Sequence, residues 1–152
     1  LAEAFGMEII VGALPNRSTG NRMALSELLP QVDFLSLHCP LTEETRDLID
    51  SKAFEKMKPS AFLINCARGG IVNEHDLATA LRTGKIAGAA TDVLSVEPPK
   101  EGNVLLANNI PNLIITPHSA WGSVDARQRI VQQLTENASA FQQGKPIRQV
   151  GL

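Results

Sequence analysis

Three ionisable side chains, Arg68, Glu97 and His118, follow short apolar runs of the sequence. The runs cover residues 62–67, 87–93 and 112–117, and each is typical of a buried strand. Ligands of open α/β sheets bind beyond the carboxyl ends of the strands, so these side chains should gather at one edge of one sheet. A guanidinium, a carboxylate and an imidazole are the groups needed to hold a carboxylate substrate and to move a proton at its carbonyl.

The elements that must position these residues alternate along the chain. The pattern predicts strands over residues 7–11, 33–38, 61–66, 85–93 and 113–116. It predicts helices over residues 22–29, 43–49, from Asp50 or Ser51 to 57, from an Asn73 cap to Gly84, and over 123–143. The last helix carries an apolar stripe of Val131, Leu134, Ala138 and Phe141, and residues 98–112 form a loop with at most one helical turn. This order predicts a doubly wound, mostly parallel α/β sheet of the Rossmann type.

Composition limits the class of protein. The chain has 152 residues, 43% hydrophobic and 20% charged, with a net charge of -2, which is ordinary for one globular domain. Neither a nucleic-acid nor a membrane partner is expected, because there is no basic excess and no long apolar stretch. Cys39 and Cys66 are too few for a disulfide framework or a zinc site, so we expect reduced thiols in a cytoplasmic protein and no metal.

The start of the chain predicts that an element is missing. Residues 1–6 resemble the last turn of a helix closed by Gly6, and a predicted strand follows at once. We therefore expect a partial dinucleotide-binding domain that lacks its first βα unit, with a tail from about residue 143 and no substrate domain. In the doubly wound order, the missing strand would lie between the strands at 7–11 and 61–66.

Four segments carry a family resemblance. Residues 65–74 (NCARGGIVNE), 91–99 (TDVLSVEPP) and 116–121 (TPHSAW) resemble the signatures of D-isomer-specific 2-hydroxyacid dehydrogenases, and residues 38–42 (HCPLT) resemble the family's segment beside the nicotinamide. The resemblance runs from about residue 7 to 146. Residues 121–123 and 126–128 are most similar to the glycerate dehydrogenase, or hydroxypyruvate reductase, branch.

The resemblance and the chemistry imply the same catalytic roles. His118 would donate the proton to the keto oxygen, and Glu97 would bond the other ring nitrogen and favour the protonated ring. Arg68 would bind the carboxylate of a 2-keto or 2-hydroxy acid. The activity that the family implies is hydride transfer between a nicotinamide cofactor and hydroxypyruvate, glyoxylate or D-glycerate, and the assembly that it implies is a homodimer.

The cofactor is NAD or NADP. No G-x-G-x-x-G turn is present, and no acidic residue follows the strand at 7–11. Asn16 can bond a ribose hydroxyl, whereas Arg17 and Ser18 can accept a 2′-phosphate, so both cofactors stay open. The resemblance implies that Asp92 accepts from the nicotinamide carboxamide. The remaining candidate cofactor contacts are His38, Cys39, Pro40, Thr45, Cys66, Ala67 and Ala120.

Structural roles compete with each of these interpretations. Taken singly, Arg68 can be a surface ion pair, Glu97 a solvated loop residue and His118 a core or helix-start histidine; their joint spacing favours the catalytic interpretation. Asp92 is equally well explained as a cap for backbone groups, and the two cysteines as packing residues. A non-enzymatic nucleotide-sensing module or corepressor on the same scaffold, and an inactive fragment, remain alternatives.

Overall fold

The computed structural model describes residues 1–16 and 20–150. It divides into two compact units, Leu1–Pro117 and His118–Leu152. Arg17 and Ser18, the candidate 2′-phosphate contacts, lie outside the described residues.

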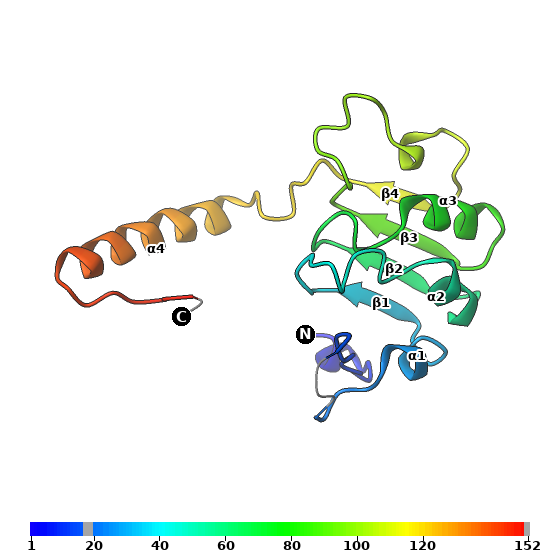
Figure 1. Cartoon of the computed structure of the whole chain (residues 1–152), viewed down its shortest axis with the longest axis horizontal. Coiled ribbons are helices and arrows are strands. Elements are labelled where there is room, and N and C mark those ends of the chain that lie inside the picture. Colours follow the sequence, from blue (N-terminus) through cyan, green and yellow to red (C-terminus); the bar gives the residue numbers. More distant parts are fainter. Residues whose placement is uncertain (17–19, 151–152) are drawn as a thin grey trace. The chain divides into compact units, whose positions relative to one another are not determined.

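The first unit is built on a four-stranded parallel sheet. Its strands are β1 (Phe34–Leu37), β2 (Phe62–Asn65), β3 (Gly88–Thr91) and β4 (Leu113–Ile115), and they lie in the order β1-β2-β3-β4 (Figure 1). The sheet and its flanking helices confirm the predicted Rossmann-like α/β class. Because every strand runs in the same direction, the segments that follow the strands meet at one edge.

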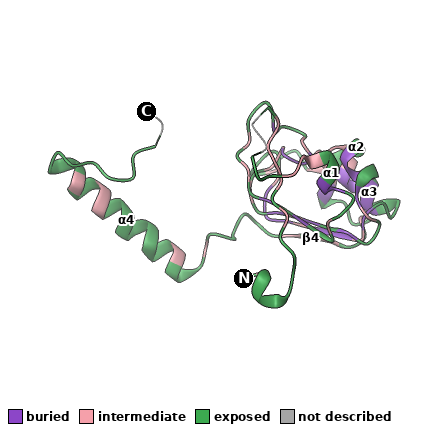
Figure 2. Ribbon diagram, turned by 90° about the horizontal axis from the view of Figure 1, so that it is seen from below, coloured by how far each residue is buried: buried purple, intermediate pink, exposed green. Residues whose placement is uncertain are grey.

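One face of the sheet forms the core. Leu35, Leu63 and Ala89 lie in register on neighbouring strands and are buried. Helices α2 (Ser51–Lys56) and α3 (Glu74–Arg82) cover this face and bury their own apolar side chains, including Phe54 and Leu77 (Figure 2). This packing anchors the carboxyl ends of the strands.

The other face of the sheet is more exposed. Phe34 on β1 and Phe62 on β2 are register partners whose rings stack with centroids 5.5 Å apart, and they are 54% and 41% exposed. Gly88 on β3 is the register partner of Phe62. A Cβ at position 88 would lie only 3.0 Å from the Phe62 ring, so glycine leaves room for this ring.

The prediction of a strand over residues 7–11 is wrong for the described chain. The backbone here makes a single parallel bridge, between Gly12 and Met23, in which the Ala13 N–H donates to the Met23 carbonyl at 2.8 Å. A strand needs a ladder of successive backbone partners, and a single bridge does not supply one.

The prediction that residues 61–66 border an unpaired position in the sheet is also wrong. β2 lies between β1 and β3, so residues 61–66 do not border an unpaired position. In the described sheet the edge strand next to β2 is β1. Periodicity locates strands along a chain but does not say which strands are neighbours, because pairing joins segments that are distant in sequence.

Two predicted helices differ from the structure. Helix α1 (Leu25–Leu28) is shorter than the predicted 22–29, and residues 43–49 form hydrogen-bonded turns instead of a helix. Within these turns, Asp47 has a φ of 50° and its N–H donates to the Gly70 carbonyl. Ile49 then pairs with Val72, so tertiary backbone bonds replace the helical ones.

The remaining helical predictions are confirmed. Asp50 caps α2 by accepting from the Ala53 N–H at 3.0 Å, and Asn73 caps α3 by accepting from the Asp76 N–H at 3.1 Å. Gly84 follows α3 with a φ of 67°. The loop after β3 contains one short 3-10 turn, η2 (Val104–Leu106), and the chain opens with another, η1 (Glu3–Phe5), closed by Gly6.

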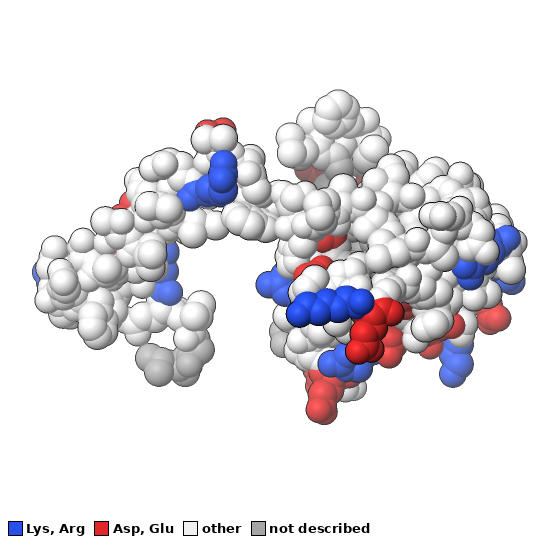
Figure 3. Space-filling view, turned by 90° about the horizontal axis from the view of Figure 1, so that it is seen from above, with Lys and Arg blue, Asp and Glu red and all other residues white. Residues whose placement is uncertain are grey.

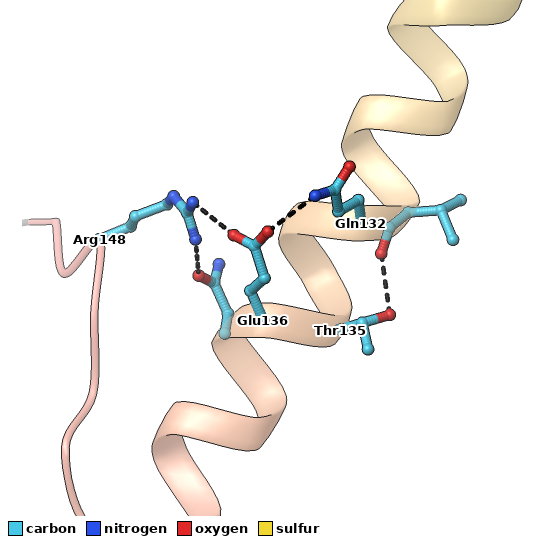
Figure 4. Close-up of polar contacts among 6 residues, drawn as sticks. Gln132, Thr135, Glu136 and Arg148 are labelled. Carbon is cyan, nitrogen blue, oxygen red and sulfur yellow. Dashed lines mark hydrogen bonds and ion pairs between the residues drawn. The ribbon is translucent and has the colours of Figure 1, made fainter.

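The second unit consists mainly of α4 (Val124–Gln142), which matches the predicted range 123–143 and is capped by the Ser123 side chain. Arg148, in the segment after the helix, donates to Glu136 at 2.6 Å and to Asn137 at 3.0 Å (Figure 4). No residue of α4 is buried, and the predicted apolar stripe is exposed. None of the described helices is long and apolar enough to cross a membrane.

Candidate active site

The first candidate catalytic residue, Arg68, lies just past the carboxyl end of β2. The buried Asn65 side chain shapes this turn, because its Oδ1 accepts from the Ala67 N–H at 3.1 Å and its Nδ2 donates to the Arg68 carbonyl at 3.0 Å. The Arg68 guanidinium is exposed and donates through Nη1 to the Ala67 carbonyl at 2.7 Å. A guanidinium carries five N–H donors, more than this bond uses.

The second candidate, Glu97, lies on the loop that follows β3. Its Oε1 accepts from the Leu94 N–H at 2.8 Å, which folds the loop back on itself. The Glu97–Pro98 peptide is cis. The Glu97 residue is exposed.

The turns that carry Arg68 and Glu97 touch through their backbones. A Cβ added to Gly69 would lie 1.9 Å from the Leu94 carbonyl oxygen and 2.5 Å from the Ser95 nitrogen. Only glycine permits this approach. The structure therefore places the turn that carries Arg68 against the loop that carries Glu97, within the same unit.

The third candidate, His118, is the first residue of the second unit. It follows β4 and the short segment to Pro117, as the sequence predicts. Its φ of 51° is uncommon for a residue other than glycine, and conformations of this kind concentrate at functional sites. The Trp121 Nε1–H donates to the His118 carbonyl at 2.9 Å.

Two candidate cofactor residues are buried. Asp92, directly after β3, is 3% exposed and accepts from the Thr116 hydroxyl, which joins the ends of β3 and β4. Thr45 is 2% exposed, and its hydroxyl donates to the Pro40 carbonyl at 2.7 Å and accepts from the Thr42 N–H at 2.8 Å. Thr45 therefore holds the backbone of the turn after β1.

Five of the other candidates directly follow strands of the sheet. His38, Cys39 and Pro40 follow β1, and Cys66 and Ala67 follow β2. Both cysteines are free thiols, and partial burial raises the pKa of Cys39. His38 Nε2 is 2.8 Å from the Ser36 hydroxyl. Asn16 is exposed with a φ of 56°, and Ala120 lies in the second unit.

The residues at this edge of the sheet have the chemistry needed to bind a nicotinamide. Small and apolar residues after β1 and β2 suit a flat ring, and the buried Asp92 carboxylate suits the N–H of a carboxamide. A parallel sheet with helices on its core face, and with ionisable side chains beyond its carboxyl edge, is the arrangement of a nucleotide-binding α/β domain.

Comparison with known proteins identifies the family. The family model for the NAD-binding domain of D-isomer-specific 2-hydroxyacid dehydrogenases matches residues 1–120, and the chain belongs to this family. It is 46% identical over 145 residues to the glycerate dehydrogenase of Methylorubrum extorquens, covering 95% of the chain and 46% of that protein. It is 37% identical over 155 residues to the hydroxypyruvate reductase of Blautia hydrogenotrophica, covering 99% and 48%.

A solved structure shows the same fold. The NAD-complexed D-isomer-specific 2-hydroxyacid dehydrogenase of Lactobacillus delbrueckii ssp. bulgaricus superposes with a TM-score of 0.81 at 31% identity, covering 96% of this chain and 49% of that one. The chain spans about half the length of the curated relatives named above.

Proposed function

We propose that the protein carrying this chain reduces a small 2-keto acid with a nicotinamide cofactor, and that hydroxypyruvate or glyoxylate is the substrate, D-glycerate being the reverse substrate. The main support is the close approach of the Arg68 turn to the Glu97 loop at Gly69, because the proposed substrate-binding group and the proposed catalytic carboxylate lie on these two segments. The names of the relatives, glycerate dehydrogenase and hydroxypyruvate reductase, support the substrate class.

Arg68 binds the substrate in this proposal. Its planar guanidinium pairs with the carboxylate and polarises the adjacent keto oxygen. Asn65 holds the turn in place through both ends of its amide. The carboxylate is thereby oriented before the reaction begins.

His118 and Glu97 move the proton. The His118 imidazole donates a proton to the keto oxygen while the carbonyl carbon receives hydride, and Glu97 accepts a hydrogen bond from the other ring nitrogen. The pair needs Glu97 to hold one orientation, which the bond from the Leu94 N–H favours.

The cofactor supplies the hydride when bound. Asp92 would hold the nicotinamide carboxamide by accepting its N–H, and the backbones at Cys39–Pro40 and Cys66–Ala67 would border the ring. Thr45 supports the first of these turns through its bond to Pro40. His38, Asn16 and Ala120 remain further proposed contacts.

The experiment is steady-state reduction of hydroxypyruvate and glyoxylate by the intact protein, with wild type, Arg68→Lys and His118→Ala. His118→Ala should lower turnover by about 10²–10⁴-fold, the usual range for a lost general acid, with unchanged NADH affinity. Arg68→Lys should weaken substrate binding and slow turnover together. NADH binding without reduction of any 2-keto acid would instead favour a nucleotide-sensing module.

Cofactor preference is a separate part of the proposal. Because no acidic residue follows Val11, we expect weak discrimination against NADP. Arg17→Ala should weaken NADPH binding selectively if that side chain meets a 2′-phosphate. Equal losses for NADH and NADPH, measured by fluorescence titration, would remove Arg17 from the site.

The assembly and location are also proposals. We propose a cytoplasmic location, in keeping with two free thiols and with mixed acidic and basic side chains on the face drawn in Figure 3, and a homodimer, which the family resemblance implies. Light scattering of the intact protein and cell fractionation test these two statements.

A further inference from the structure

Glu74, the first residue of α3, holds the loop that carries Glu97. Its Oε1 accepts from the Ser95 N–H at 2.7 Å. Its Oε2 accepts from the Ser95 hydroxyl at 2.6 Å and from the Asn103 Nδ2 at 2.8 Å. One half-buried carboxylate thus binds the loop at two residues.

These bonds act directly beside the Glu97 contact. The Leu94 N–H donates to Glu97, and the next N–H along the chain, that of Ser95, donates to Glu74. The carbonyl between those two N–H groups lies against Gly69. The Leu94–Ser95 peptide is therefore held through its carbonyl by packing and through its N–H by a charge-assisted hydrogen bond.

The carboxylate also links the two catalytic turns. Glu74 follows Arg68 by six residues, at the start of α3, and its carboxylate binds Ser95, which lies 21 residues further along the chain. Asn73, the residue before Glu74, caps α3, and this cap fixes the backbone position from which the Glu74 side chain extends. The position of the Glu97 loop relative to Arg68 is set by this bridge together with Gly69.

We propose that Glu74 is a positioning residue, which acts on the reaction by holding Ser95 and thereby the orientation of Glu97. This inference rests on the proposed function, because it assigns Glu97 a part in proton transfer. Glu74 acts through the loop and not by touching the substrate.

The test replaces Glu74 with Gln in the intact protein. The amide keeps the shape of the carboxylate but turns one acceptor into an NH₂ donor, which cannot accept from the Ser95 or Asn103 groups, so the bridge loses bonds. We expect kcat/KM for hydroxypyruvate to fall about 10-fold to 100-fold, as a misplacement approaching 1 Å does, with unchanged NADH affinity. Amide hydrogen exchange over residues 93–97 should become faster.

Asp76→Asn is the matched control. Asp76 lies in the same first turn of α3, and its Oδ2 accepts from the Ser51 N–H at 2.8 Å, which ties α3 to α2 instead of to the Glu97 loop. This variant removes the same charge from the same helix start. It should leave kcat/KM and exchange over residues 93–97 unchanged.

A double-mutant cycle separates positioning from general destabilisation. If Glu74 acts through Glu97, the loss caused by Glu74→Gln should disappear in a Glu97→Gln background. Ser95→Ala, which removes one donor and keeps the carboxylate, should give a smaller loss with the same dependence on Glu97 and serves if Glu74→Gln does not fold.

The outcomes distinguish the two proposals. If Glu97→Gln by itself leaves keto-acid reduction intact, the proposed role of Glu97 fails, and this inference falls with it. If Glu97→Gln is impaired while Glu74→Gln and Ser95→Ala match wild type, only the positioning role is overturned. Losses that add independently of Glu97 would likewise overturn it.

Discussion

Replacing Gly69 with Ala tests whether the contact between the catalytic turns controls activity. The added Cβ would lie 1.9 Å from the Leu94 carbonyl oxygen and 2.1 Å from its carbonyl carbon, and both are backbone atoms that no rotamer change can move. The turns must separate by roughly 1 Å before this distance reaches the 3.0 Å that real Cβ contacts respect. Glu97, three residues after Leu94, should move with the loop.

The expected loss follows from that displacement. A misplacement of about 1 Å costs on the order of 10²-fold in rate, which corresponds to about 2.7 kcal/mol of transition-state stabilisation. Overpacking should also destabilise the fold by about 1–3 kcal/mol. Hydroxypyruvate reduction followed by NADH absorbance, together with urea unfolding, measures both losses in the intact protein.

Gly84→Ala provides the control for destabilisation. Gly84 follows the opposite end of α3 with a φ of 67°, and a Cβ added there would have no heavy atom within 4 Å. Alanine at this position should cost about 1–2 kcal/mol of stability without moving either catalytic turn. Wild-type kcat/KM in Gly69→Ala, or an equal activity loss in Gly84→Ala, would show that the contact at Gly69 does not control activity.

Three further predictions concern single contacts. Asp50→Ala should lower the free energy of unfolding by about 0.5–2 kcal/mol, measured in urea, because α2 loses its cap. Thr45→Val should cost about 1–3 kcal/mol in the same assay, because the Pro40 carbonyl loses its donor; stability equal to wild type would contradict either assignment. Hydrogen bonds from Arg148, and then from Gln132, lower the pKa of Glu136. The stabilisation that these bonds give is therefore fully present above the ordinary carboxyl pKa, and it is lost as pH falls through the lowered pKa. An NMR titration should show the Glu136 pKa rising in Arg148→Ala, and an unchanged value would exclude the pairing.

Local patterns in the sequence determined much of this protein. The caps Asp50 and Asn73 predict where two helices begin, because each cap bonds an N–H only three residues away. The apolar runs before Arg68 and Glu97 predict strands whose carboxyl ends meet, because parallel neighbours must share an edge.

Tertiary structure decided what long-range contacts control. Residues 43–49 have a helical pattern, yet Ile49 bonds to the backbone around Val72, and pairing between distant segments is invisible to local periodicity. Local periodicity also cannot reveal the packing of Gly69 against Leu94 or the hydrogen bond from Ser95 to Glu74, because each joins residues 21 or more positions apart. The sequence by itself thus determined which groups are available for chemistry, whereas only the folded chain decided how two of them are held, because their support comes from contacts between distant segments.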